Sequence, residues 1–115
     1  MSIHSIDWSR LEWQEIRGGV YRKAFSGEGA TVALHRLDPG HVPNPHAHPY
    51  EQIVYILAGE VDFHVGDEVK RLGPGGLLVV PPNIVHYAEV IGGEPVLNLD
   101  VFTPARKEIV GQVGR

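Results

Sequence analysis

The 115-residue chain contains no cysteine. A disulfide framework and a metal site built from thiolates are therefore both excluded. A metal ion would have to be held by imidazole, carboxylate or amide donors. A chain of this length can nevertheless bury the core of one domain without covalent crosslinks.

Neither basic nor acidic residues are in large excess in the chain. Ten basic and fourteen acidic residues give a formal charge of −4, and like charges form no block. The sequence therefore indicates neither a nucleic-acid-binding surface nor a polybasic membrane patch. No stretch is long and apolar enough to cross a bilayer, and residues 1–13 lack the basic and apolar regions of a signal peptide. We expect a cytoplasmic protein that binds neither nucleic acid nor membrane.

Glycine and proline, in contrast, are abundant, with 14 and 9 copies. They separate short apolar runs, which is typical of many tight turns. Such spacing predicts an all-β sandwich or barrel. Residues 7–16 are predicted to form a helical turn or a loop, with Trp8 and Trp13 as lids, and residues 104–113 a short helix that begins at proline. The predicted strands cover residues 20–25, 31–37, 46–57, 61–65, 69–72, 77–80, 86–91 and 95–102.

Residues 46–52 carry two histidines at alternate positions, followed by a glutamine. Side chains two residues apart share one face of an extended strand. Tyr50 would lie on this face, whereas Glu51, the better ligand by charge, would point to the other. A third histidine follows a Pro-Pro turn further along the chain. The predicted metal ligands are His46, His48, Gln52 and His86.

Three imidazoles and a neutral amide would leave the charge of a divalent ion unneutralised. Such an ion is a strong Lewis acid and lowers the pKa of a bound water. Nitrogen and oxygen donors suit zinc, nickel, manganese or iron, so we expect one divalent metal ion without specifying which. The other histidines have no informative spacing, and we expect structural or surface roles for His35 and His64 and a place at the pocket rim for His41.

The last predicted strand has one polar and one apolar face. Asn98, Asp100 and Phe102 share the face that suits a pocket. The opposite face, with Leu97 and Leu99, must be covered by a second sheet or a partner subunit. Because small all-β domains have edge strands to protect, we expect a homodimer.

These residues resemble the two motifs of the cupin superfamily. The first motif is read here at Gly40, His46, His48, Gln52 and Gly59, with glutamine in the position where the family usually has glutamate. The second is read at Gly75, Pro81, Asn83, His86 and Val90, where Asn83 replaces a glycine and Val90 an asparagine. The resemblance spans about residues 31–102. It implies a double-stranded β-helix barrel with the metal near its mouth, in a single domain of residues 1–115 with an N-terminal strand or arm (1–30) and a C-terminal tail (103–115).

Residues 100–106 also look like those of the pectin-degradation cupins, which open the ring of 4,5-unsaturated uronates into linear keto acids. This resemblance implies that Asp100 is a catalytic general acid/base and that Arg106 grips a substrate carboxylate. Phe102 and Tyr50 would form the substrate-binding wall. Ala105 stands where a second proline is common in that group.

Three functions are compatible with these features. The leading hypothesis is a metal-dependent enzyme of the lyase or isomerase type that acts on an unsaturated uronate or related sugar acid. An iron-dependent dioxygenase is the second, although glutamine is an unusual partner for iron. The third is a non-catalytic module that binds a sugar or another metabolite.

Overall fold

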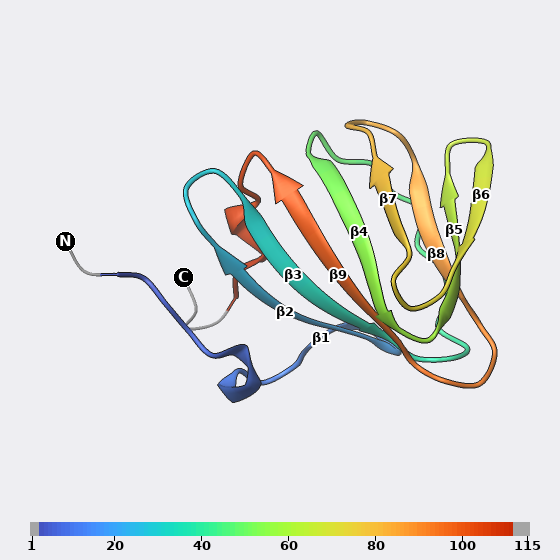
Figure 1. The fold of residues 1–115 in the computed structure, drawn as a ribbon, viewed down its shortest axis with the longest axis horizontal. Helices are drawn as coiled ribbons and strands as arrows, with labels where there is room; N and C mark the ends of the chain where they lie inside the picture. Colours follow the sequence, from blue (N-terminus) through green and yellow to red (C-terminus); the bar gives the residue numbers. More distant parts are fainter. Residues whose placement is uncertain (1–2, 112–115) are drawn as a thin grey trace.

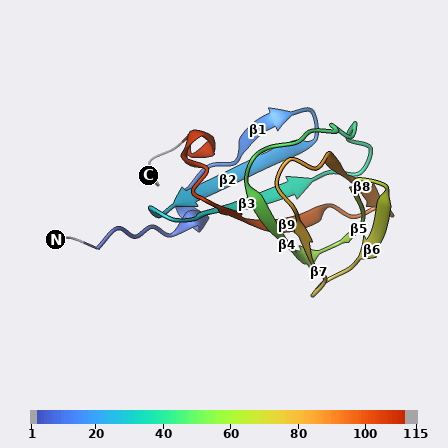
Figure 2. The ribbon, with the colours of Figure 1, turned by 90° about the horizontal axis from the view of Figure 1, so that it is seen from above.

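A computed structural model describes residues 3–111 as two antiparallel β-sheets. The larger sheet has the strand order β1-β2-β3-β9-β4-β7, and the smaller sheet has the order β6-β5-β8. Figures 1 and 2 show the smaller sheet at the β4–β7 end of the larger one. The predicted all-β fold of the double-stranded β-helix type is confirmed. The strands are β1 (Gln14–Arg17), β2 (Val20–Ser26), β3 (Thr31–Leu37), β4 (Glu51–Ala58), β5 (Glu60–Val65), β6 (Glu68–Leu72), β7 (Leu77–Val80), β8 (His86–Ile91) and β9 (Val96–Thr103).

The N-terminal region contains one strand that the sequence did not predict. A short 3₁₀ helix covers Trp8–Arg10, as expected for a helical turn, and β1 then pairs antiparallel with β2. Both Trp8 and Trp13 are half-buried. Residues 14–17 lack the alternation of apolar and polar side chains that marks a half-buried strand, so the pattern alone could not reveal β1.

The strand predicted over residues 46–57 begins only at Glu51. The prediction was wrong for residues 46–50, where Pro49 has no N–H group to donate to a strand ladder. His46 instead forms an isolated bridge with His86: its N–H donates to the His86 carbonyl at 3.2 Å, and the His86 N–H donates back at 2.9 Å. The histidine segment is thereby attached directly to the start of β8.

The C-terminal helix prediction was also wrong in extent. A single 3₁₀ turn covers Lys107–Ile109, and residues 112 and 113 lie outside the described residues. Adjacent side chains Ile109 and Val110 are both buried against Ala24, Ala33 and Phe102. The described part of the tail therefore packs onto the barrel wall next to β9.

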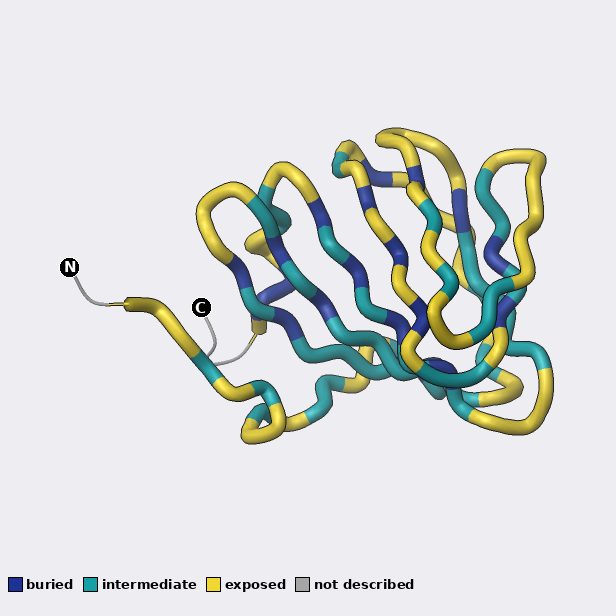
Figure 3. The backbone as a smooth tube through the Cα atoms, in the orientation of Figure 1, coloured by how far each residue is buried: buried dark blue, intermediate teal, exposed yellow. Residues whose placement is uncertain are grey.

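Buried and less buried residues alternate along the central strands, as the dark blue and lighter bands of Figure 3 show. The register aligns the inward side chains in rows across β2, β3, β9 and β4. One row carries Ser26, Thr31, Phe102 and Gln52, the next Ala24, Ala33, Asp100 and Val54, and a third Arg22, His35, Asn98 and Ile56. The rows place polar side chains inside the barrel, above an apolar core.

The outer face of β4 and β7 is apolar and open. We name the exposed apolar side chains on this face the outer apolar patch. Within it, Ile53 of β4 lies opposite Val79 of β7, and Tyr55 lies opposite Leu77. Each is more than a third exposed. The patch consists of Ile53, Tyr55, Leu57, Leu77 and Val79.

In residues 3–111 no helix has the length and apolar character needed to span a membrane.

Candidate functional site

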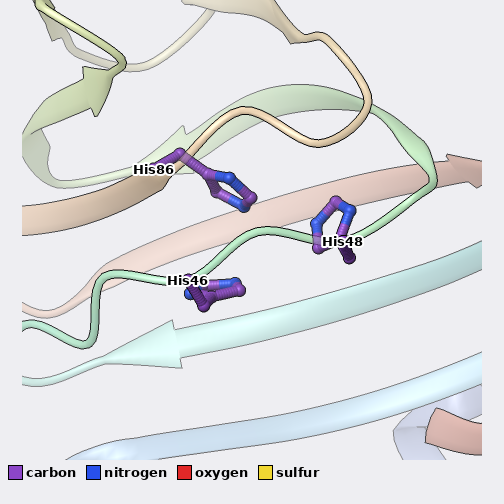
Figure 4. A group of neighbouring side chains, drawn as sticks. All are labelled: His46, His48 and His86. Carbon is purple, nitrogen blue, oxygen red and sulfur yellow. The ribbon is translucent and has the colours of Figure 1, made fainter.

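Three histidine side chains converge at one end of the barrel. One ring nitrogen from each lies within 4.8 Å of the others. Figure 4 shows the rings of His46 and His48, from the segment before β4, turned toward the ring of His86 at the start of β8. His86 and His48 are buried, and His46 is exposed at the rim. The structure thus brings together three of the four predicted ligand side chains in one cluster.

The main chain fixes the orientation of all three rings. Each Nδ1 lies 2.7 to 3.1 Å from a backbone carbonyl two residues away, belonging to Asn44, Tyr50 and Ile84 for His46, His48 and His86 respectively. A carbonyl oxygen can only accept a hydrogen bond, so each Nδ1 carries the proton. The lone pair of each neutral ring therefore lies on Nε2, on the side away from the carbonyl.

The fourth predicted ligand, Gln52, lies beside this cluster. Its amide Nε2 donates to Asp100 Oδ1 at 2.8 Å, and its Oε1 lies 3.0 Å from His48 Nε2. Because His48 Nε2 and the amide oxygen are both acceptors, their approach is favourable only with a positive charge between or beside them. His86 Nε2 is buried with no hydrogen-bond partner. This donor set fits a divalent cation.

Burial lowers the pKa of His86 to about 4. The ring is therefore neutral at pH 7, which is the form that binds a metal ion. Glu51, the competing candidate ligand, is exposed, whereas Gln52 is only 5% exposed.

Asp100 lies next to the imidazole cluster in the centre of β9 and is 1% exposed. Its Oδ1 accepts the Gln52 amide, while its Oδ2 lies 2.8 Å from His35 Nδ1 and 3.3 Å from Asn98 Nδ2. The role of His35 beside this carboxylate was missed. Alternation along residues 31–37 gave a signal for it, because His35 shares the inward face of β3 with Ala33 and Leu37.

A cavity of about 200 Å³ joins these groups. It is smaller than pockets for drug-sized ligands, which suits a small metabolite. His41 lines the cavity, as expected for a rim residue, whereas His64 is not part of the lining and stacks on Tyr87, which is. Other predicted site residues on its wall are His46, Gln52, His86, Asp100, Phe102 and Arg106.

Arg106 enters the cavity from the C-terminal tail. Its backbone N–H donates to Thr31 Oγ1 at 2.7 Å, and its guanidinium lies 4.9 Å from the centre of the Phe102 ring. Its Nε is 3.5 Å from a carboxylate oxygen of Glu108, which also accepts the Tyr50 hydroxyl. Tyr50 is not part of the cavity lining but packs edge-on against Phe102, so its contact with substrate stays a prediction.

Two further arginines line the same cavity and were missed. Arg22 comes from β2 and Arg17 from β1. Arg22 alternates with the buried residues Val20 and Ala24, a signal that could have identified its inward position. No pattern in the sequence around Arg17 indicates that its side chain lines a cavity.

Comparison with known proteins gives a consistent result. Residues 33–102 match the family model described as "Cupin domain". The structure is similar to an RmlC-like cupin from Shewanella frigidimarina, with 28% identity, a TM-score of 0.84, and coverage of 95% of this chain and 97% of that one. It is also similar to KdgF from Halomonas sp., with 27% identity, a TM-score of 0.79, and coverage of 88% and 94%. Among curated proteins, the H2HPP isomerase of Bacillus subtilis is 30% identical over 93 residues, which are 79% of this chain and 38% of the isomerase.

Proposed function

This chain belongs to the cupin family, and we propose that it is a metal-dependent enzyme that opens the ring of an unsaturated uronate or a related sugar acid. The observation that carries the proposal is the cavity whose wall carries His46 and His86 of the imidazole cluster beside the buried carboxylate of Asp100 and several arginines. His48 completes the cluster just outside the cavity lining. The sequence resemblance to pectin-degradation cupins and the structural similarity to KdgF support the same substrate class.

The proposed ligands of the metal ion are His46, His48, His86 and Gln52. A divalent ion held there, which we propose to be zinc, nickel, manganese or iron, would polarise a substrate oxygen as a Lewis acid. The protein's own contribution is to orient the donors through backbone carbonyls and to hold the amide oxygen of Gln52 through Asp100.

Asp100 is the proposed general acid/base. Its carboxylate accepts hydrogen bonds from Gln52 and Asn98 and lies 2.8 Å from His35 Nδ1, which restricts its orientation toward a substrate. Asp100 would move the protons that ring opening and the enol-to-keto conversion require. His35 Nδ1, at 2.8 Å from Oδ2, forms an ion-pair contact with this carboxylate when the ring is protonated.

Arg106 and the aromatic residues would bind the substrate. The guanidinium presents two parallel N–H donors to a carboxylate, and its stacking on Phe102 restricts its orientation. Tyr50 supports this arrangement indirectly, because its hydroxyl binds Glu108 and thereby fixes the segment that carries Arg106.

A direct assay tests the proposal. Unsaturated galacturonate and mannuronate are incubated with protein loaded with zinc, nickel or manganese, and the ultraviolet absorbance of the ring double bond is followed. We expect accelerated loss of absorbance, and a loss of this acceleration in Asp100→Asn. A rate equal to that in buffer would remove the assignment. Oxygen consumption by the iron-loaded protein with a diketone or a catechol would favour the dioxygenase function instead.

We also propose that the enzyme is a cytoplasmic homodimer. Contiguous apolar side chains on a monomer surface are typical of an interaction site, and β7 is an edge strand of the larger sheet. A second copy related by a two-fold axis would cover the outer apolar patch of each subunit with the same patch of the other.

A further inference from the structure

Two cationic side chains in the cavity, Arg22 and Arg17, have no ion-pair partner in the described part of the chain. Arg22 points from β2 into the barrel, in the same inward row as His35 and Asn98, and lines the cavity. Its Nε is buried without a hydrogen-bond acceptor, and none of residues 3–111 forms an ion pair with its guanidinium. A partly buried guanidinium whose Nε has no acceptor is unfavourable, so the position of Arg22 favours an anion that the described residues do not supply.

The neighbouring charges strengthen this requirement. Burial, together with the positive charge of Arg106, lowers the pKa of Arg22. Arg17 adds a third guanidinium to the same cavity wall. The acidic side chains nearby are already engaged: Asp100 by its amide and imidazole partners, and Glu108 by Arg106 and Tyr50.

We propose that Arg22 and Arg106 together bind the carboxylate of the substrate, and that Arg22 makes the cavity selective for acidic over neutral ligands. This inference rests on the proposed function, since it assigns the substrate carboxylate of that same site. Arg106 has a carboxylate neighbour in Glu108, so part of its charge is offset before the ligand arrives. Glu108 acts on Arg22 only at longer range, and no carboxylate of the described residues lies within ion-pair distance of it, so Arg22 gains most when a carboxylate enters.

The expected loss of ligand affinity on replacing Arg22 can be judged from the strength of charge-assisted hydrogen bonds to a carboxylate. Their loss corresponds to a decrease in affinity of about tenfold to a hundredfold. A lysine at position 22 would restore the charge but not the paired N–H donors, so we expect Arg22→Lys to recover only part of the affinity. Arg22→Met keeps most of the side-chain volume and removes an unpaired buried charge, so its thermal unfolding temperature should equal or exceed that of the wild type.

The experiment compares Arg22→Met and Arg22→Lys with the control Arg36→Met. Arg36 lies on the outward face of β3 and pairs with Asp38 at 2.9 Å, outside the cavity. Binding of D-galacturonate and of its neutral counterpart D-galactose is measured by calorimetry. We expect the wild type and Arg36→Met to prefer the acid, and Arg22→Met to lose at least about tenfold of this preference while remaining folded. Equal preference in the wild type and Arg22→Met would overturn the inference.

Kinetics separate this inference from the proposed function. If unsaturated uronates are turned over, we expect Arg22→Met to raise KM by about tenfold to a hundredfold with a smaller change in kcat. Unchanged KM would overturn the role of Arg22 and leave the proposed function standing. If no uronate is turned over, the calorimetric comparison still decides, now with 2-oxo acids and dicarboxylates against their amides. A wild type that prefers none of these acids would overturn the inference.

Discussion

Gly59 offers a sharp test of how tightly the barrel is packed behind the site. It connects β4 to β5 with a φ of 82°, in the left-handed region that favours glycine. A Cβ atom added there would lie 2.6 Å from the Pro95 carbonyl oxygen and 2.9 Å from Val96 Cα. Both are backbone atoms at the start of β9, so neither can move aside without displacing the strand that carries Asp100.

The expected cost of Gly59→Ala has two parts. An alanine in left-handed backbone costs about 1–2 kcal/mol, and overpacking adds about 1–3 kcal/mol. The lower entropy of the unfolded alanine chain offsets about 0.5–1 kcal/mol. We therefore expect a net loss of about 1–4.5 kcal/mol in the free energy of unfolding. Gly92→Ala is the matched control, because Gly92 has a φ of 89° and no atom within 4 Å of an added Cβ. Its expected loss is about 1 kcal/mol.

Urea denaturation followed by circular dichroism measures both values. The protein is first treated with a chelator, since a bound metal would add its own stabilisation. In thermal unfolding, the difference between the two variants should appear as a Tm of Gly59→Ala lower by roughly 4 °C for each kcal/mol. Equal losses in Gly59→Ala and Gly92→Ala would refute the reasoning, because they would mean that the start of β9 relaxes freely.

Three further predictions concern the site and the surface. Gln52→Ala should lose at least about tenfold in metal affinity by elemental analysis and titration, whereas Glu51→Ala should keep it; the reverse result would exchange the two as ligands. His86 has a folded pKa of about 4 against an ordinary 6.5, so the unfolded chain takes up its proton first. The stability that it contributes to the metal-free protein is complete above pH 6.5 and falls by up to about 3 kcal/mol toward pH 4, and His86→Gln should flatten this dependence in urea titrations. Light scattering should report a dimer for the wild type and a monomer for the Tyr55→Glu, Leu77→Glu double variant; a monomeric wild type would contradict the proposed interface.

The fold was largely predictable because its strands follow simple patterns. Residues 31–37 alternate between buried and partly exposed side chains, and the turns around them contain glycine. The errors have local causes: Pro49 prevents the strand pairing that the histidine spacing suggested, and residues 14–17 form a strand through pairing with β2 rather than through their own pattern. The prediction of four ligands on one strand face therefore rested on a wrong local structure, although the structure brings those side chains together.

Contacts within the site that depend on the register between strands could not be predicted from the sequence. His35 and Asp100 are 65 positions apart in the sequence and meet only because β3 pairs with β9 so that Ala33 lies opposite Asp100. The proximity of Arg22 to His35 similarly depends on the register between β2 and β3. No spacing rule relates such residues, because their neighbourhood is set by which strands pair and by the offset between them.

The backbone carbonyls that orient the three imidazoles have one more consequence. These contacts are local, within two residues of each histidine, and involve no other side chain. Exchanging cavity-wall residues that do not touch the rings, such as Arg22, would therefore leave these carbonyl contacts in place. A protein built in this way could change its preferred ligand by altering its arginines while the geometry of the three imidazoles is retained.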